Sequence, residues 1–247
     1  DRWVYRLAPF VALIPYLVAM SAIPLSPDVV GADVPASALF VLAATGVGII
    51  GTLMGGWASA SKYSLLGGMR AAAQLVSYEL PMVIAVASVA LAAGTLSLIS
   101  IVDAWNPWWL LWQAPGAFVF LVAAVAELQR PPFDMPIADS EIVFGVFTEY
   151  TGLRFAFFLL AEYAGIVIFS LLFSVLWLGG WSGPLENWLG WLWTLLKGLA
   201  IAVVIIWLRV TWPRLREDQL QRLAWVWLDP IALLQLAITA VGVVMMR

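Results

Sequence analysis

The sequence predicts an all-α integral membrane protein with seven transmembrane helices, and three observations support this fold class. Of the 247 residues, 64% are hydrophobic and only 11% are charged, whereas a soluble domain of this size carries about 25% charged residues. The mean hydropathy is +0.98. Apolar stretches of about 20 residues, the length of one bilayer crossing, recur along the whole chain. A lipid bilayer is therefore the solvent that suits this composition.

Seven apolar stretches are long enough to cross a membrane once each. No internal repeat and no soluble domain is visible among them, so we expect one transmembrane domain over residues 1–247. The fourth and fifth stretches are separated by an amphipathic loop in which acidic and apolar residues are mixed, as expected for a segment that lines a cavity or docks a partner. The predicted spans are 4–25, 37–57, 71–93, 107–126, 154–178, 188–208 and 223–246.

Lysine and arginine residues alternate between the two ends of these stretches. The N-terminal segment and the second, fourth and sixth connections contain ten of the twelve basic residues, whereas the connections 26–36, 94–106 and 179–187 contain none. The positive-inside rule assigns the basic side to the cytoplasm. We therefore expect a multi-pass protein of the cell's inner (plasma) membrane. No cleavable signal peptide is expected, because no small-residue cleavage site follows the first apolar stretch.

The absence of two residue types limits the chemistry of this chain. With no cysteine and no histidine, it cannot hold Cys-ligated iron–sulfur clusters or His-ligated haem, and most zinc sites are excluded. We therefore expect no metal site. If the chain moves protons along side chains, carboxylates must carry most of them.

One glycine pattern has two interpretations. Gly46, Gly48 and Gly51 match the G-x-G-x-x-G dinucleotide fingerprint, but that fingerprint needs a preceding strand and the start of a helix. Here the pattern lies inside an apolar span. Gly51 and Gly55 also form G-x-x-x-G, which is typical of closely packed membrane helices. We therefore expect helix packing here.

Four ionisable residues lie inside predicted spans, where a charge costs about 2.5–3.5 kcal/mol on insertion scales. They are Glu79, Glu162, Lys197 and Asp229. Counted at about 1.5 Å per residue from the basic ends of their helices, all four lie ~10–18 Å deep. Such a band predicts a lateral row that passes charge in the membrane plane. Buried ion pairs that fix helix packing are the alternative, and Asp229 precedes Pro230, so a helix kink is an alternative there.

Three stretches resemble one family. The first stretch is GWASASKYSLLGGMR at residues 56–70, which continues to QLVSYE at 74–79. The second is AELQRPPFD at residues 126–134, which continues through 140–141 and 149–150 to AEY at 161–163. The third is PRLREDQL at residues 213–220. Together they resemble the membrane subunit of respiratory complex I (proton-translocating NADH–quinone oxidoreductase) that seals the quinone chamber, known as the H or ND one type. The resemblance covers nearly the whole chain. The family usually has eight transmembrane helices, and this sequence resembles it from the second onward.

The resemblance implies a set of functional residues. Lys197 matches a family lysine, and several acids match the family's proton path from the quinone chamber, whereas Ile137 replaces an acid found in many relatives. The proton-path positions are Glu79, Glu127, Asp139, Glu141, Glu149, Glu162 and Lys197. The positions beside the quinone chamber are Arg130, Phe133, Asp134, Phe155 and Phe158.

The resemblance also implies the wider function. It indicates a membrane-arm subunit of a redox-driven proton pump, with a quinone as substrate, FMN and iron–sulfur clusters in partner subunits, and other subunits of the complex as partners. Residues 131–165 look most like actinobacterial versions, which implies menaquinone. Three alternatives stay open: a related subunit of a membrane-bound hydrogenase or of a ferredoxin- or F420-linked dehydrogenase, a free-standing secondary transporter, and a purely structural anchor.

Overall fold

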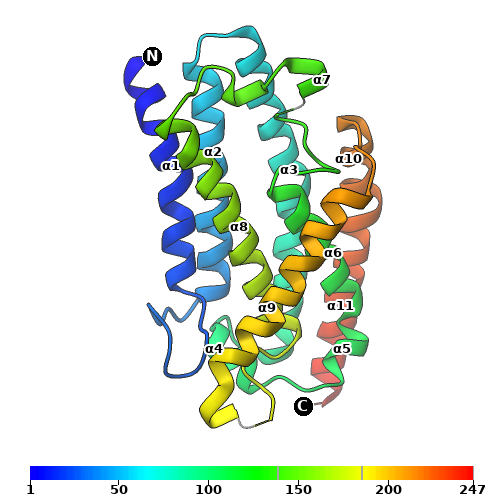
Figure 1. Cartoon of the computed structure of the whole chain (residues 1–247). Helices are drawn as coiled ribbons and strands as arrows, with labels where there is room; N and C mark the ends of the chain where they lie inside the picture. The colour runs from blue at the N-terminus through cyan, green and yellow to red at the C-terminus, as the bar shows by residue number, and fades with distance from the viewer. Residues whose placement is uncertain (138, 185, 247) are drawn as a thin grey trace.

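The computed structural model describes residues 1–137, 139–184 and 186–246, and its regular elements are helices. Within these described ranges, six helices are long and apolar enough to cross a membrane. They form an elongated bundle (Figure 1), so the predicted all-α membrane fold is confirmed. The long helices are α1 (Arg2–Ser21), α2 (Ser37–Ala58), α3 (Lys62–Ala93), α8 (Leu153–Trp177), α9 (Glu186–Thr211) and a last helix composed of α10 (Glu217–Leu223), the π-helical η2 (Ala224–Leu228) and α11 (Asp229–Met246).

The fourth predicted span has a different form from the prediction. Instead of one helix over 107–126, the chain forms the short α5 (Trp109–Trp112) and then α6 (Ala114–Glu127). Pro115 lies in the first turn of α6, and because proline lacks an N–H it cannot continue a preceding helix. At about 1.5 Å per residue α6 is only ~21 Å long. It packs between α3, α8 and α11, so this short helix is surrounded largely by protein.

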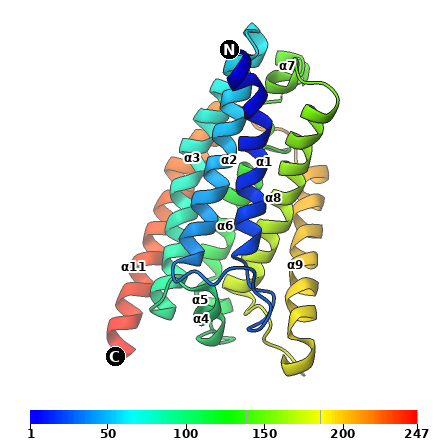
Figure 2. The same ribbon diagram turned by 90° about the vertical axis from the view of Figure 1, so that its left-hand side faces the viewer.

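The connections divide between the two ends of the bundle. Figures 1 and 2 place the N-terminus, the α2–α3 turn and the α6–α8 loop at one end, which we call the basic end, and the α9–α10 link lies toward it. The loop contains α7 (Asp139–Ile142) and the 3₁₀ helix η1 (Gly145–Phe147). The opposite end holds α4 (Leu98–Asp103), α5 and the C-terminus (Figure 2). The four basic segments therefore lie toward one end, as the alternation of lysine and arginine predicted.

Glycines bring α1, α2 and α3 into close contact. A Cβ atom on Gly51 would lie 2.3 Å from the backbone nitrogen of Ala12 in α1, and one on Gly48 would lie 2.4 Å from the ring of Tyr16. The same α2 helix meets α3 at Gly56, where a Cβ would lie 2.9 Å from the Cα of Gly68. The packing interpretation of these glycines is confirmed, since they lie at helix crossings.

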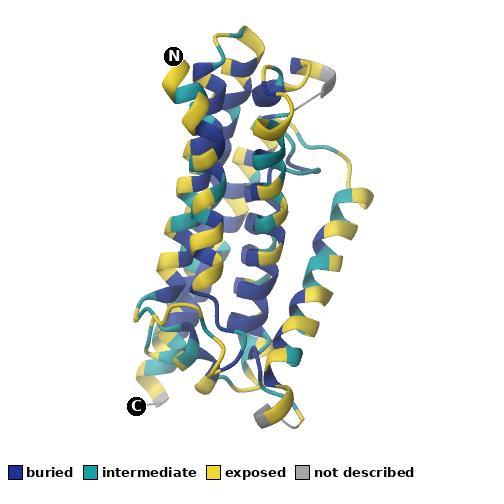
Figure 3. Cartoon of the chain, turned by 60° about the vertical axis from the view of Figure 1, so that its left-hand side comes forward, coloured by how far each residue is buried: buried dark blue, intermediate teal, exposed yellow. Residues whose placement is uncertain are grey.

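The helix α9 is the least enclosed of the long helices. It contacts the rest of the bundle mainly through α8, and much of its surface is exposed (Figure 3). Ile205, near its C-terminal end, is buried in the main core, whereas Trp188 and Val210 are exposed. This helix therefore presents one face outward, to lipid or to another membrane chain.

The glycine contact between α1 and α2 predicts the effect of one added methyl group. Because Gly51→Ala would press a methyl group into the backbone of α1, we expect a loss of about 1–3 kcal/mol in stability, seen as a lower melting temperature of the purified protein in mild detergent. Gly242→Ala is the matched control, since no atom lies within 4 Å of a Cβ there. Equal stability of the two variants would contradict this packing.

Candidate functional site

A cavity opens at the basic end between α8, the end of α9 and the α6–α8 loop. Its volume is about 260 Å³. Arg130 of the loop forms an ion pair with Glu162 of α8 at its edge. Burial lowers the pKa of Arg130, and the positive charge of Arg209 lowers it further, yet a guanidinium stays charged. The wall consists of Gln129, Arg130, Pro131, Asp134, Ile137, Phe144, Phe147, Phe155, Leu159, Glu162 and Arg209.

A second, smaller cavity leads inward from Glu162. It has a volume of about 40 Å³ and lies where α1, α2, the end of α6 and α8 meet. Glu162 lines it on one side and Glu127, the last residue of α6, on another. Glu127 is only 4% exposed, and its Oε1 has no hydrogen-bond partner among the described residues. Burying a carboxyl group in this way costs free energy, so Glu127 is a candidate for a functional role.

A third void joins Glu127 to Glu79. Its volume is about 10 Å³, roughly the room that one water molecule needs. Both glutamates line it, together with Gly46. A Cβ atom on Gly46 would lie 3.1 Å from Oε1 of Glu79, so the missing side chain makes room for this carboxylate. Glu79 is itself exposed on the outer surface of α3.

The three cavities form a series in which neighbours share a glutamate. Glu162 lines the first and second cavities, and Glu127 lines the second and third. The series therefore runs from the basic end, through the interior, to an outward-facing acid halfway along α3. Carboxyl groups arranged in this way can pass protons among themselves, directly or through water, and their titrations are coupled.

Two tyrosines beside this row were not predicted. Tyr16 of α1 lines the second cavity together with Glu127. Tyr78, which precedes Glu79, is 1% exposed, and its hydroxyl has no hydrogen-bond partner among the described residues. Hydroxyl groups can donate and accept a proton in one relay step. A search for charged residues in the sequence does not find them, because tyrosine is uncharged. Tyrosine is also common at membrane interfaces, so its presence in a span does not indicate a functional role.

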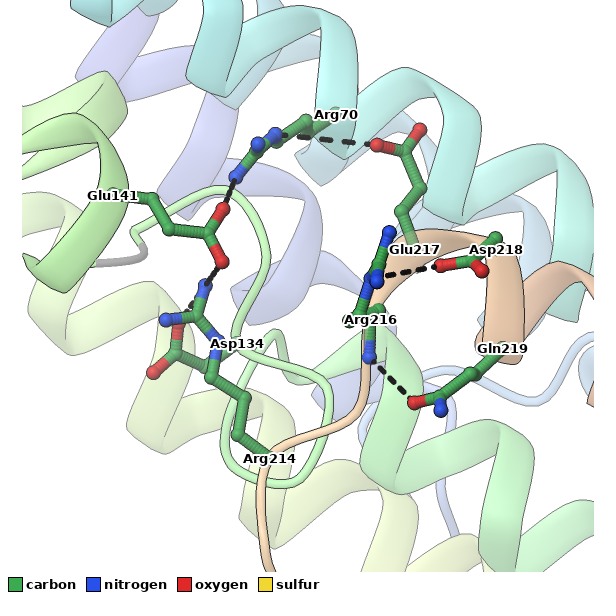
Figure 4. A network of polar contacts seen from close by, with 8 residues as sticks. All are labelled: Arg70, Asp134, Glu141, Arg214, Arg216, Glu217, Asp218 and Gln219. Atoms are coloured by element: carbon green, nitrogen blue, oxygen red, sulfur yellow. Dashed lines mark hydrogen bonds and ion pairs between the residues drawn. The ribbon is translucent and has the colours of Figure 1, made fainter.

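Ion pairs attach the α6–α8 loop to its neighbours (Figure 4). Arg70 of α3 donates a hydrogen bond to Glu141 at 2.6 Å and lies 3.9 Å from Glu217 of α10. Arg214, in the α9–α10 link, lies 3.8 Å from the other oxygen of Glu141 and 4.0 Å from Asp134. The hydrogen bond from Arg70 holds the pKa of Glu141 below its ordinary value of 4.5. The loop is thus fixed to both α3 and the α9–α10 link.

Aromatic rings hold the other side of this loop. Phe147 packs on Phe155 and Phe158 of α8, at 5.7 and 5.0 Å between ring centroids. Tyr150 stacks on Tyr5 of α1 at 4.3 Å and donates a hydrogen bond to the Tyr5 carbonyl at 3.0 Å. Burial raises the pKa of Tyr150 above its usual range, and Tyr5 raises it further. The phenol therefore stays neutral.

The expectation that Lys197 belongs to the same band as the glutamates is wrong. Its ammonium group donates three hydrogen bonds of 2.8 Å to the carbonyl oxygens of Leu178, Gly180 and Ser182. Leu178 lies 16 residues beyond Glu162, which is about 24 Å along α8. The long lysine side chain reaches toward the opposite end of the bundle, where it caps the carbonyl groups that follow α8.

Other predicted residues lie outside the row. Phe133 is buried in the core, where its carbonyl accepts a hydrogen bond of 2.9 Å from Gln74, and it is not among the residues that line the first cavity. Glu149 is exposed at the basic end, and its carbonyl accepts a hydrogen bond from Tyr5 at 2.6 Å. Asp139 begins α7, but its side chain lies outside the described part of the chain.

Comparison with known proteins identifies one family. The family model described as NADH dehydrogenase matches residues 1–240. A relative from Geobacillus kaustophilus (strain HTA426), named as the H subunit of NADH-quinone oxidoreductase, is 45% identical over 246 residues, which is 98% of this chain and 73% of that protein. Proteins of the same name from Geobacillus thermodenitrificans and Bacillus cytotoxicus are each 46% identical, over 98% and 97% of this chain and 74% and 73% of their own length.

The ion pairs of Glu141 predict a pH dependence of loop attachment. Because its pKa is lowered in the folded protein, its contribution is present above pH 4.5 and is lost as the pH falls through the lowered pKa. The side chain is 48% exposed, so the contribution is at most about 1 kcal/mol. In Glu141→Gln, we expect limited proteolysis to cut the loop faster at pH 7. The two rates should approach each other as the pH falls below 4.5 and through the lowered pKa of Glu141.

A control keeps the loop but changes an acid outside these ion pairs. The exposed Glu149 serves this purpose as Glu149→Gln. If Glu149→Gln and Glu141→Gln raise the cleavage rate at pH 7 equally, the assignment of the anchor to Glu141 is contradicted.

Proposed function

The chain belongs to the NADH dehydrogenase family, as the membrane-arm H subunit of NADH–quinone oxidoreductase, and from this premise we propose that it forms the membrane side of the quinone chamber and the first stretch of a carboxylate proton path. As part of that enzyme, it acts with other subunits of the complex on a quinone. The observation that supports this proposal best is the series of cavities joined by Glu162 and Glu127.

The first cavity has the chemistry of one wall of a quinone site. Phe144, Phe147 and Phe155 offer apolar rings to a quinone, while Arg130 and Arg209 can stabilise negative charge that develops on its reduction. The volume of about 260 Å³ is slightly below the roughly 300–1,000 Å³ of complete ligand sites, as expected if a peripheral subunit supplies the facing wall. The likeness of residues 131–165 to actinobacterial sequences supports menaquinone as the substrate.

Coupling starts at the ion pair between Arg130 and Glu162. When a quinone in the first cavity gains negative charge or takes up a proton, the electrostatic potential at Glu162 changes. The change is large because the dielectric constant of the interior is low. Glu162 then exchanges a proton with Glu127, and Glu127 exchanges one with Glu79. Each step is an acid–base exchange, so this chain needs no redox centre of its own.

The outward-facing Glu79 suggests where the path continues. An exposed carboxyl group in the middle of a membrane helix is unstable against lipid, so we propose that another membrane subunit covers this face of α3 and receives the proton. The basic end then faces the cytoplasm, where its anchored loop meets the peripheral subunits that bind the quinone. FMN and iron–sulfur clusters belong to those partner subunits.

The substitution Glu162→Gln tests this function. In membranes carrying this variant, we expect quinone reductase activity coupled to NADH oxidation and proton pumping to fall together, by about 100-fold or more, which is the scale of losing one proton-transfer group. Glu162→Asp, which keeps the acid, should retain part of both activities. Because Glu162 pairs with Arg130, assembly of the complex is checked on a native gel.

Two outcomes of the Glu162→Gln experiment lead to opposite conclusions. Loss of both activities in a complex that assembles normally supports a role of Glu162 in coupling. Normal activity and normal pumping in Glu162→Gln would reduce Glu162 to a packing residue and contradict the proposed path.

A further inference from the structure

The structure contains a buried acid that the proposed path does not use. Among the described residues, only two acidic residues are buried: Glu127 and Asp229, which are 4% and 6% exposed. Neither oxygen of the Asp229 carboxyl group has a hydrogen-bond partner among those residues. Within the described part of the chain, Asp229 is thus buried with unpaired carboxyl oxygens, much as Glu127, the central member of the glutamate row, is buried with its Oε1 unpaired.

The helix irregularity expected before Pro230 is present, because the π-helix η2 directly precedes Asp229, but the Asp229 side chain does not act as a helix cap. An acid that caps a helix has an extended backbone and accepts a hydrogen bond from a backbone N–H. The backbone of Asp229 is helical, with φ −62° and ψ −49°, and joins η2 directly to α11. Within the described part of the chain, no backbone N–H donates such a bond to its carboxyl oxygens. The residue therefore does not cap a helix end.

Asp229 lies at nearly the same depth as Glu79. The last helix and α3 run in the same direction and pack together (Figure 1). Arg70 and Glu217 lie 3.9 Å apart and mark a common level. Glu79 follows Arg70 by nine residues, or ~14 Å, and Asp229 follows Glu217 by twelve, or ~18 Å. The two acids thus differ in depth by about one helical turn.

The backbone around Asp229 departs from a regular α-helix on both sides. The preceding five residues form the π-helix η2, and such turns are frequent at functional sites. The following residue, Pro230, has no N–H and removes one backbone hydrogen bond. The helix around Asp229 therefore lacks at least one backbone hydrogen bond that a regular α-helix would form.

Polar residues continue along the same buried face of α11 toward the opposite end. Gln235 donates hydrogen bonds to the Trp112 carbonyl at 2.8 Å and to Gln113 at 3.2 Å. The hydroxyl of Ser88 in α3 lies 3.1 Å from Oε1 of Gln113. The side chains of Ser88, Gln113 and Gln235 are at most 1% exposed. Polar groups therefore extend between α3, α6 and α11 beyond the depth of Asp229.

We propose that Asp229 is a further proton-carrying residue of this protein, which exchanges protons with the glutamate row at the depth of Glu79. The buried cluster of Ser88, Gln113 and Gln235 extends this branch toward the opposite end. The step is an acid–base exchange in which the Asp229 carboxyl group accepts one proton and later releases it. The proposal rests on the proposed function of the row but concerns a separate residue on a separate helix.

The test compares Asp229→Asn with wild type in the purified, assembled complex. Asparagine has the same shape but cannot exchange a proton. Redox-difference infrared spectroscopy should show a carboxylic C=O band that changes on quinone reduction, shifts in D₂O and is absent from Asp229→Asn. Proton pumping per quinone reduced in proteoliposomes should fall at least twofold. Asp33→Asn, a change of an exposed acid at the opposite end, should keep both the band and the pumping ratio.

The outcomes separate this proposal from the proposed function. A complete infrared spectrum and a normal pumping ratio in Asp229→Asn, while Glu162→Gln loses coupling, would overturn the role of Asp229 alone. Normal coupling in both variants would overturn the path as a whole. Asp229→Leu serves as a second variant in case Asp229→Asn does not fold. A stable Asp229→Leu protein with full pumping would also overturn the role of Asp229, because a packing position accepts an apolar side chain.

Discussion

An acidic group is stable within a bilayer only where protein or a water-filled cavity surrounds it instead of lipid. The rest of this structure depends on that constraint. The short helix α6 ends at Glu127 inside the bundle, where lipid cannot reach the carboxyl group. The loop that follows is held by Arg70 and Arg214 through its acids. The interior therefore encloses carboxyl groups at the depth where apolar packing would otherwise be expected.

Close helix packing allows this arrangement without large cavities. Gly48 and Gly51 let α2 approach α1, and Gly46 leaves room for the carboxylate of Glu79. The cavities between the glutamates are consequently small, about 40 and 10 Å³, and can hold only a few water molecules. Proton transfer is then confined to a narrow route, while bulk water and ions remain excluded.

The sequence predicted much of this fold, and its errors have physical causes. Hydropathy predicts long apolar helices such as α2 and α8 directly. Pro115, however, interrupts a helix inside an apolar run, so α6 is shorter than hydropathy indicated. Depth counted along one helix misplaced Lys197, because a flexible side chain spans a further turn to reach its carbonyl partners. Tyr16 and Tyr78 gave no signal, since only the fold brings them beside the glutamates.

The most direct measurement of the central claim concerns Glu127, which lines both inner cavities. In Glu127→Gln, which changes one oxygen to an amide, quinone reduction and proton translocation would be measured together in proteoliposomes after assembly is confirmed. A proton path through the shared cavities predicts that translocation is lost with the complex intact. Translocation at the wild-type ratio to quinone reduced would contradict it, since no proton could then pass by way of Glu127.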